Sequence, residues 1–486
     1  MPVPRPRRLT GSAGRRVAVA LGLLGILVTA CAPLPPPPTT PPPTPPPTTP
    51  PAMTPPGALP AGLPDRLGIG LAASTDDLAP SGWVASTGVP FDYAYQYLAG
   101  GVNTGGGWQT WNANAQFPLL YAQAAKARGA IPVLTYYMLL QSTGPCGSCG
   151  EARQDLTNLN TTALMAAYYQ DFTTLLQRLG STTVGGLAGY GGTVIVQVEP
   201  DLSGYAEQAV LDPADNCYGY CTGTGNDPNL LRASVASSGN ADVAAYPNTW
   251  RGFNLALLHL RDRYAPNVEL GFHVSNWSTG PDIGSDPSAA LNGTTQGDLA
   301  GSFAAASGVT SAPAGTSTYN LVFNDVANRD AGYAKYVLGQ SNAFWDQRNV
   351  TLPDFTRWEQ YLSAVTSTTG RRAIVWQVPL GNQWSRSENN TPGHYQDNKA
   401  EYFFAHPNEL TTVGAIAVLY GQATTGSTTN TDADHDGITN PSSFCTTDGL
   451  STGTACNTHV ATVSDDDGGY LRTAAAAYYV APLPLG

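Results

Sequence analysis

The sequence predicts an α/β fold, a (β/α)8 TIM-type barrel, because eight short apolar or β-branched runs alternate with segments of helical period. The runs span residues 66–73, 93–98, 131–139, 193–200, 268–274, 319–325, 373–379 and 415–421. Helix-period segments lie between most of them, at 113–128, 159–179, 248–264, 355–366 and 396–405, and the first connection is short. Eight such repeats favour a closed parallel barrel, and an open doubly wound sheet is the alternative.

The N-terminus has the pattern of an export signal. Five arginines precede an apolar segment at 17–29 that is too short for a mature membrane-spanning helix. The segment ends in "LVTAC", which resembles a bacterial lipobox, the motif whose cysteine is lipidated after cleavage. We therefore expect a lipoprotein signal peptide over 1–30, a lipid on Cys31, and an exported protein anchored to a membrane at the cell surface.

Residues 31–62 are almost entirely proline, threonine and alanine. Such a composition favours an extended, disordered linker, and residues 63–486 then form the barrel domain with loop insertions. The net charge of the whole chain is −12, and charged residues make up only 12% of it. This balance makes nucleic acid a poor partner.

Six further cysteines occur in three close pairs. The predicted disulfides are local, and they join Cys146 to Cys149, Cys217 to Cys221, and Cys445 to Cys456. An even number of cysteines in an exported chain favours disulfides, while zinc binding by the two closest pairs is the alternative.

The segment "DADHDGITN" after the eighth strand predicts a structural calcium ion. Aspartates at alternate positions followed by glycine supply the first oxygen ligands and the turn of a calcium loop. The expected ligands are Asp432, Asp434, Asp436, the carbonyl of Ile438, and Asn440. Calcium would order an insertion at about 423–467, and a heat of binding in calorimetry would check the site. We expect no organic cofactor.

The run "TVIVQVEPD" raises the question of function, because a buried strand ends in two carboxylates. All strands of a parallel barrel end at one mouth, so the residues that finish them belong to one site. Pro200 predicts an extended backbone at Glu199, which would direct that side chain to the mouth. The structural alternative is that Glu199 caps the next helix or pairs with an arginine.

Carboxylates among aromatic rings favour cleavage of a glycosidic bond, since one carboxyl protonates the leaving oxygen and another activates water or attacks the sugar. The chain has no nucleotide-binding glycine loop, GxSxG elbow or HExxH motif. We expect Glu199 to be the proton donor and Asp325 the second carboxylate, with Asp201 as the alternative. The expected substrate-binding residues are Tyr136, His273, Asn276, Trp277, Asn324, Trp376, Gln377 and Trp384.

The order of motifs resembles that of glycoside hydrolase family six, the cellobiohydrolases and endoglucanases. The resemblance lies in "VQVEPD", a later "GFHVSNWSTG" and then "NLVFNDVANRD". It implies a barrel that acts on a polysaccharide or cell-wall glycan. The family's Arg-Asp-Cys loop has a counterpart in "QSTGPCGSCG", which keeps the cysteine and lacks the acid. That difference favours the alternative function, a surface lipoprotein that binds glycan on a degenerate barrel without cleaving it.

Overall fold

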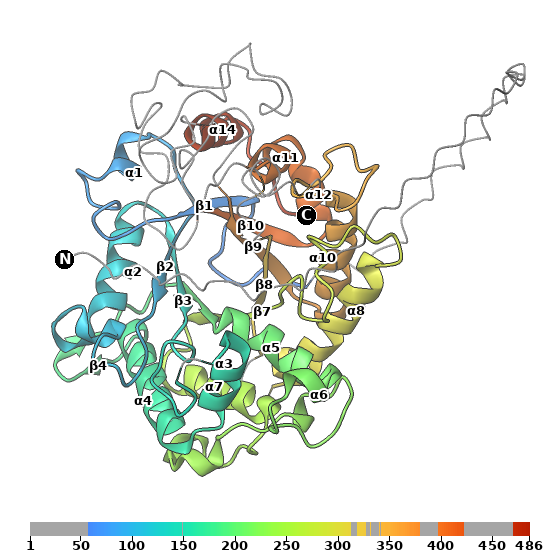
Figure 1. Ribbon diagram of the computed structural model, residues 1–486. Coiled ribbons are helices and arrows are strands. Elements are labelled where there is room, and N and C mark those ends of the chain that lie inside the picture. The colour runs from blue at the N-terminus through green and yellow to red at the C-terminus, as the bar shows by residue number, and fades with distance from the viewer. Residues whose placement is uncertain are drawn as a thin grey trace, which may run out of the picture. The chain divides into compact units, whose positions relative to one another are not determined.

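The computed structural model describes residues 57–147, 149–312, 318–326, 331, 340, 342–379, 397–421 and 470–486. Within these residues, eight parallel strands form one closed barrel in the order β1-β10-β9-β8-β7-β6-β3-β2 (Figure 1). The strand β1 pairs with both β2 and β10, so the sheet has no open edge. The predicted (β/α)8 fold is confirmed, and the open doubly wound sheet is wrong.

The eight predicted runs all become barrel strands. Their bounds are β1 (Gly68–Ala72), β2 (Tyr93–Leu98), β3 (Ile131–Tyr136), β6 (Val194–Val198), β7 (Val268–His273), β8 (Leu321–Asp325), β9 (Arg372–Val378) and β10 (Ala415–Tyr420). Two strands are shorter than predicted. The strand β3 ends at Tyr136 instead of residue 139, and β6 ends at Val198 instead of residue 200. A small antiparallel hairpin, β4 (Thr183–Val184) and β5 (Leu187–Ala188), lies outside the barrel.

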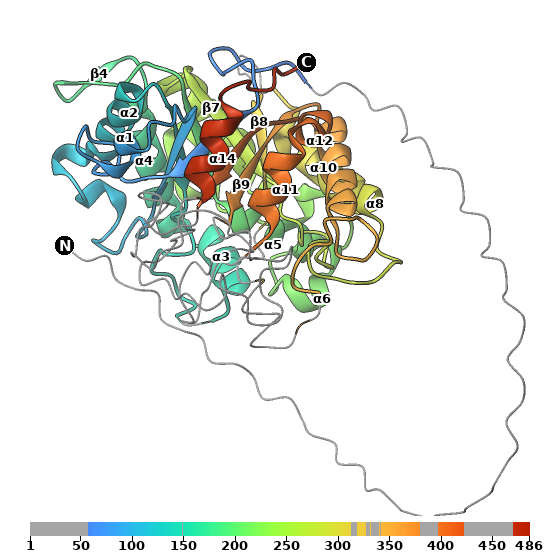
Figure 2. The same ribbon diagram turned by 90° about the horizontal axis from the view of Figure 1, so that it is seen from above.

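Helices surround the barrel and cover the outer face of its strands (Figure 1). Those described are α1 (Trp83–Ser86), α2 (Phe117–Ala127), α3 (Glu151–Leu159), α4 (Thr162–Leu179), α5 (Pro200–Leu211), α6 (Pro213–Asn216), α7 (Trp250–Tyr264), α8 (Gly293–Ala304), α10 (Phe355–Thr369), α11 (Lys399–Ala405), α12 (Pro407–Thr412) and α14 (Tyr470–Tyr478). The last of these, α14, packs beside α11 (Figure 2). Short 3-10 turns and a π-helical turn at Ala305–Val309 complete the connections.

The interior of the barrel is filled by every second residue of the strands, because successive side chains of a strand point to opposite faces. Val133, Ile195, Phe323 and Ile374 belong to one buried cluster inside the barrel. Gly271 of β7 makes room for this packing, since a Cβ atom there would lie 2.2 Å from the Phe323 ring. The phase of this alternation decides which residues at the strand ends face the mouth.

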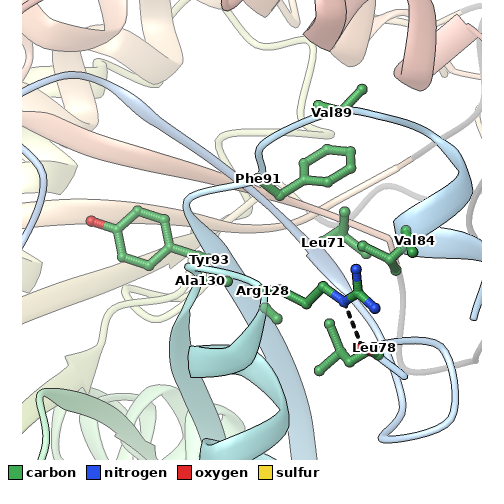
Figure 3. A pocket seen from close by; sticks show the side chains of 10 residues that line it. Leu71, Leu78, Val84, Val89, Phe91, Tyr93, Arg128 and Ala130 are labelled. Carbon is green, nitrogen blue, oxygen red and sulfur yellow. Dashed lines mark hydrogen bonds between the residues drawn. The ribbon is translucent and has the colours of Figure 1, made fainter. Parts of the chain in front are cut away.

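The first strand-to-strand connection is short, as the sequence pattern predicts, and it contains only the four-residue helix α1. A cavity of about 110 Å³ lies between this segment, β1 and the start of β2 (Figure 3). Most of the residues that line it are apolar, and the Arg128 Nε–H beside it donates to the Leu78 carbonyl at 2.7 Å. The cavity is therefore formed by the segment around α1 together with β1, the start of β2 and the residues just before β3.

Two of the three predicted disulfides are confirmed, Cys146–Cys149 and Cys217–Cys221. The remaining pair lies outside the described residues, as do Cys31, Trp384 and all five expected calcium ligands. In the described part of the chain, no helix combines the length and apolar character that crossing a membrane requires. The same residues contain no group of three or more His, Cys, Asp or Glu side chains arranged to hold a metal ion.

Candidate functional site at the barrel mouth

Four strands contribute the inward-facing polar residues at the carboxyl end of the barrel. Thr135 follows the interior residue Val133 by two positions, and Gln197 follows Ile195 in the same way. By the same alternation, His273 and Asp325 finish β7 and β8 on the inside. Their side chains therefore meet near the barrel axis.

These four side chains form one chain of polar contacts. The Thr135 hydroxyl donates to Gln197 Oε1 at 2.8 Å, and Gln197 Nε2 lies 2.9 Å from His273 Nδ1. On the other side of the ring, His273 Nε2 lies 3.4 Å from Asp325 Oδ1. The first three residues are at most 1% exposed, whereas Asp325 is 9% exposed. Asp325 is thus the end of the chain that opens towards solvent.

Aromatic rings form the part of the mouth next to His273. The Trp376 ring lies 5.8 Å from the Tyr97 ring and 5.5 Å from the His273 ring, the latter edge-to-face. The next residue, Gln377, has a φ of +55° and donates from Nε2 to the Tyr97 hydroxyl. A left-handed residue other than glycine is uncommon and concentrates at functional sites. The expected substrate-binding residues His273, Trp376 and Gln377 therefore share one wall.

Asp201 lies at the mouth in the first turn of α5 and remains partly exposed. The Tyr137 hydroxyl is 3.0 Å from Asp201 Oδ2 and 2.9 Å from Glu151 Oε1. The pKa of Asp201 is raised to about 6, mainly by burial and then by the negative charge of Glu151, while His273 acts to lower it. The Tyr137 hydroxyl has one proton and can donate to only one of the two carboxyls. A proton on Asp201 or Glu151 therefore allows both contacts to be hydrogen bonds. Asp201 can therefore hold a proton near neutral pH.

Glu199 does not adopt the expected extended conformation. Its φ is 40° and its ψ is 69°, in the left-handed region, so the prediction from Pro200 is wrong. The carboxylate turns back to the loop after β3, where Oε1 accepts the N–H groups of Met138 and Leu139, both at 3.1 Å. These two bonds hold the residue in a strained backbone conformation and leave it only 1% exposed.

The enclosed position of Glu199 also sets its protonation. Burial raises its pKa to about 8, although the two backbone N–H groups and the Tyr168 hydroxyl favour the charged form. The neighbouring charge of Asp171 on α4 is a smaller contribution to the same raised value. Glu199 therefore lies under the site, between the β3 loop and the helices, rather than in the open mouth.

Replacement of Glu199 by glutamine should change how stability depends on pH. A carboxyl whose pKa is raised by folding stabilises the native state below its unfolded pKa, and this contribution is lost as pH rises through the folded value. With 4.5 and about 8 as the two values, the loss falls between pH 4.5 and 8 and is on the order of a few kcal/mol. Thermal melts should show Glu199→Gln gaining on the wild type as pH rises across this interval.

The matched control for this experiment is Asp215→Asn, which removes an exposed carboxyl from α6. That variant should show no comparable gain on the wild type between pH 4.5 and 8. A constant offset for Glu199→Gln between pH 4.5 and 8 would contradict the enclosed, protonated state.

Two expected substrate-binding residues point away from the mouth. The Tyr136 hydroxyl donates to Asp171 Oδ1 of α4 at 2.6 Å and is fully buried. Asn324 Nδ2 donates to the Val274 carbonyl at 2.7 Å, and Asn324 Oδ1 accepts from Trp358 Nε1 at 2.8 Å. Both lie one residue away from an inward-facing position, so both face the helices. Their assignment as substrate ligands is corrected to a packing role.

Asn276 and Trp277 follow β7 and differ from each other in exposure. Asn276 is 4% exposed, and its Oδ1 accepts from Asn324 Nδ2 at 3.0 Å, which also assigns it to packing. Trp277 is partly exposed, and its ring lies 4.9 Å from the Tyr205 ring of α5. The pKa of Tyr205 is raised mainly by burial and then by the negative charges of Glu151 and Asp201. Because these charges act on Tyr205, the aromatic pair lies near Asp201. Of the two, Trp277 alone keeps a surface for a substrate.

Four residues at the mouth are absent from the predicted set of strand-end residues, whereas Tyr137 belongs to that set. They are Thr135, Gln197, Tyr97 and Glu151. The sequence does indicate a special role for Gln197, because it is a polar residue inside the apolar run "VIVQV". Tyr97 lies two residues after the interior residue Tyr95, and Tyr137 lies four residues after the interior residue Val133. Because alternate residues of a strand share a face, both point into the barrel mouth. Glu151 begins α3, and no feature of the sequence indicates that this helix end reaches the mouth.

No protein-family model and no curated protein sequence matches the chain. Among solved structures, similarity is found to a GH10 protein from Paenibacillus barcinonensis, with 13% identity over 74% of this chain and 84% of that one and a TM-score of 0.33. An endo-beta-1,4-mannanase from Thermotoga petrophila is 9% identical over 85% and 77%, with a TM-score of 0.38. A protein of an aldolase/citrate lyase family from Burkholderia cenocepacia is 12% identical over 73% and 88%, with a TM-score of 0.26.

These similarities do not select a reaction, because all three TM-scores are below 0.5 and the names differ in chemistry. The resemblance to glycoside hydrolase family six rests on sequence motifs alone and stays a prediction. The barrel fold is shown by the closed parallel sheet itself.

Proposed function

We propose that this protein is a glycoside hydrolase that cleaves a polysaccharide at the barrel mouth. The observation that carries the proposal is a pair of acidic side chains with different environments at one opening. Asp201 is held by the Tyr137 hydroxyl and has a pKa raised to about 6, while Asp325 faces His273 Nε2. Carboxyl groups in environments that differ in this way divide into an acid and a base or nucleophile.

In this assignment Asp201 is the general acid, and it gives its proton to the oxygen of the leaving sugar. Asp325 then acts in one of two ways. It takes a proton from the water whose oxygen bonds to the anomeric carbon, or it bonds to that carbon itself and is later released by water. The anomeric configuration of the first product, read by NMR, distinguishes inversion from retention.

The proposed substrate contacts are the partly exposed rings around the two carboxyls. Tyr97 and Tyr137 lie with ring centroids 6.2 Å apart, and Trp277 lies on the Asp201 side. Aromatic faces suit the apolar faces of pyranose rings, while the hydroxyl and amide groups nearby bind sugar hydroxyls. Glu199 is reassigned to support, since its carboxyl orders the β3 loop next to Tyr137.

The test is incubation of the purified protein with a panel of glucans, mannans, xylans and peptidoglycan, with detection of new reducing ends. New ends from at least one polymer, absent in Asp201→Asn, support the proposal. Binding of a glycan with no cleavage by the wild-type protein would replace it with the non-catalytic glycan-binding function.

We also propose that the protein is exported and held at the cell surface by a lipid on Cys31. The support is the sequence order of arginines, apolar segment and "LVTAC". Cys31→Ser should move the protein from the membrane fraction to the soluble fraction, because it removes the lipidated atom. A wild-type protein found only in the soluble fraction, with an N-terminus after residue 31, would contradict this.

A further inference from the structure

The chain of polar contacts from Thr135 to Asp325 has a feature that the proposed reaction does not by itself require: the donor and acceptor roles along it depend on one another. An ionised carboxylate can only accept, so Asp325 Oδ1 needs a proton on His273 Nε2, which lies 3.4 Å away. A neutral imidazole with a proton on Nε2 has a bare Nδ1, which must accept. The group facing Nδ1 at 2.9 Å is therefore the NH2 end of the Gln197 amide.

The other end of the Gln197 amide agrees with this direction. Its Oε1 accepts from the Thr135 hydroxyl at 2.8 Å, so each group in the chain has the role that its neighbour needs. Reversal of the amide would put Nδ1–H against Oε1 and leave the Nε2 lone pair facing Asp325 Oδ1. The reversed amide would donate to the Thr135 hydroxyl oxygen, and the Thr135 hydroxyl proton would then lose Gln197 Oε1 as its acceptor. In a neutral imidazole the reversed arrangement thus replaces an attraction by a repulsion at Asp325.

The surroundings hold the ring in this orientation. The Trp376 ring meets the His273 ring edge-to-face at 79°, and the Ser203 hydroxyl of α5 donates to the His273 carbonyl at 2.7 Å. The charged groups that face the imidazole are Asp325 from β8 and Asp201 from α5, while the contacts from β6 and β9 are uncharged. The only group within hydrogen-bonding distance of Nδ1 among the described residues is the Gln197 amide.

We infer that Gln197 is a positioning residue that fixes His273 as the Nε2–H tautomer, so that the imidazole donates towards Asp325 and keeps that carboxylate as the acceptor in the reaction. The role in catalysis rests on the proposed function, whereas the tautomer does not. Gln197 acts through His273 and touches no substrate. A glutamine in the middle of an apolar barrel strand is explained by this role, since the position otherwise favours an apolar residue.

The test is long-range proton–nitrogen NMR of the full protein with labelled histidine. The chain contains six histidines, and the His273 signals are identified by their loss in His273→Asn. In the wild type near neutral pH, the proton should be on Nε2 and Nδ1 should have the shift of an unprotonated nitrogen. A proton on Nδ1 would overturn the inference without any variant of Gln197, whether it occurs alone, together with the Nε2 proton, or in equal populations of the two tautomers.

The variant Gln197→Glu tests the cause. A carboxylate can only accept, so it should draw a proton onto Nδ1 and reverse or doubly protonate the ring. Gln170→Glu, the same change at an exposed position of α4, should leave the His273 signals unchanged. If Gln197→Glu does not fold, Thr135→Val removes the hydroxyl that orients the amide, and it should give a mixture of tautomers. Wild-type tautomer populations in whichever variant folds would overturn the inference.

Kinetics then separate this inference from the proposed function. On a polysaccharide that the wild type cleaves, Gln197→Glu should lower kcat by at least tenfold, change KM by less than about threefold and move the pH profile. If the wild type cleaves no polysaccharide but the tautomer is as expected, the proposed function fails and the hydrogen-bond direction stands. An unchanged pH profile and kcat in a folded Gln197→Glu would overturn the positioning role.

Discussion

Asp201→Asn should lower kcat on a natural polysaccharide by roughly 10²–10⁴, because the leaving sugar then departs without a proton. The substitution keeps the size of the side chain and its ability to accept from the Tyr137 hydroxyl. Steady-state assays of reducing ends measure the loss. The loss should shrink strongly on an aryl glycoside whose phenol is a good leaving group, since that substrate needs no acid.

The proposed role of Asp201 also predicts how the activity of the wild-type protein depends on pH. A general acid must be protonated to act, and the pKa of Asp201 is raised to about 6. The rate should therefore fall as pH rises above about 6, and this limb should be absent in Asp201→Asn. Equal losses by Asp201→Asn on natural and activated substrates would contradict the assignment.

Glu199→Gln is the comparison that separates the two acidic residues of the Glu-Pro-Asp segment. Because Glu199 is enclosed by the Met138 and Leu139 N–H groups, its replacement should not depend on the leaving group. A leaving-group dependence in Glu199→Gln and none in Asp201→Asn would restore Glu199 as the acid that the sequence pattern suggested.

Asp325→Asn should reduce kcat by a similar factor, roughly 10²–10⁴, for all substrates regardless of leaving group. The amide can neither take a proton from water nor attack the anomeric carbon. Stability should change much less than activity, because asparagine keeps the size of the side chain and its Oδ1 can still accept from His273 Nε2. Thermal melts and kinetics on the same preparations measure both effects.

External azide provides a second measurement for Asp325→Asn. A small anion that enters the space left by the lost charge can attack the anomeric carbon, so azide should raise the rate and form a glycosyl azide. No such rescue is expected for Glu199→Gln, whose position is enclosed. A rate for Asp325→Asn within about threefold of the wild type would remove Asp325 from the mechanism.

Much of the architecture was predictable because it depends on short segments. Each barrel strand is an apolar run of five to seven residues, and its pattern does not depend on distant parts of the chain. The pairs Cys146–Cys149 and Cys217–Cys221 are separated by three and four positions, so local geometry brings them together. The gathering of strand ends at one mouth follows from parallel topology. The sequence therefore predicts Asp201 and Asp325 at the mouth of the barrel.

The tertiary structure decided which of these strand-end residues face the mouth. A shift of one position along a strand turns a side chain from the axis to the helices, as the neighbours Asn324 and Asp325 show. Glu199 departs from the extended backbone that Pro200 favours, because two N–H groups from residues 60 and 61 positions away bind its carboxylate.

The sequence by itself determined the barrel, the two local disulfides and the set of strand ends from which a site is built, since each depends on composition and order within a short segment. Only the closed barrel decided the hydrogen-bond chain of Thr135, Gln197 and His273, whose members lie 62 and 76 positions apart. Such contacts arise when strands close around a common axis, and their direction is set by the donors and acceptors that meet there.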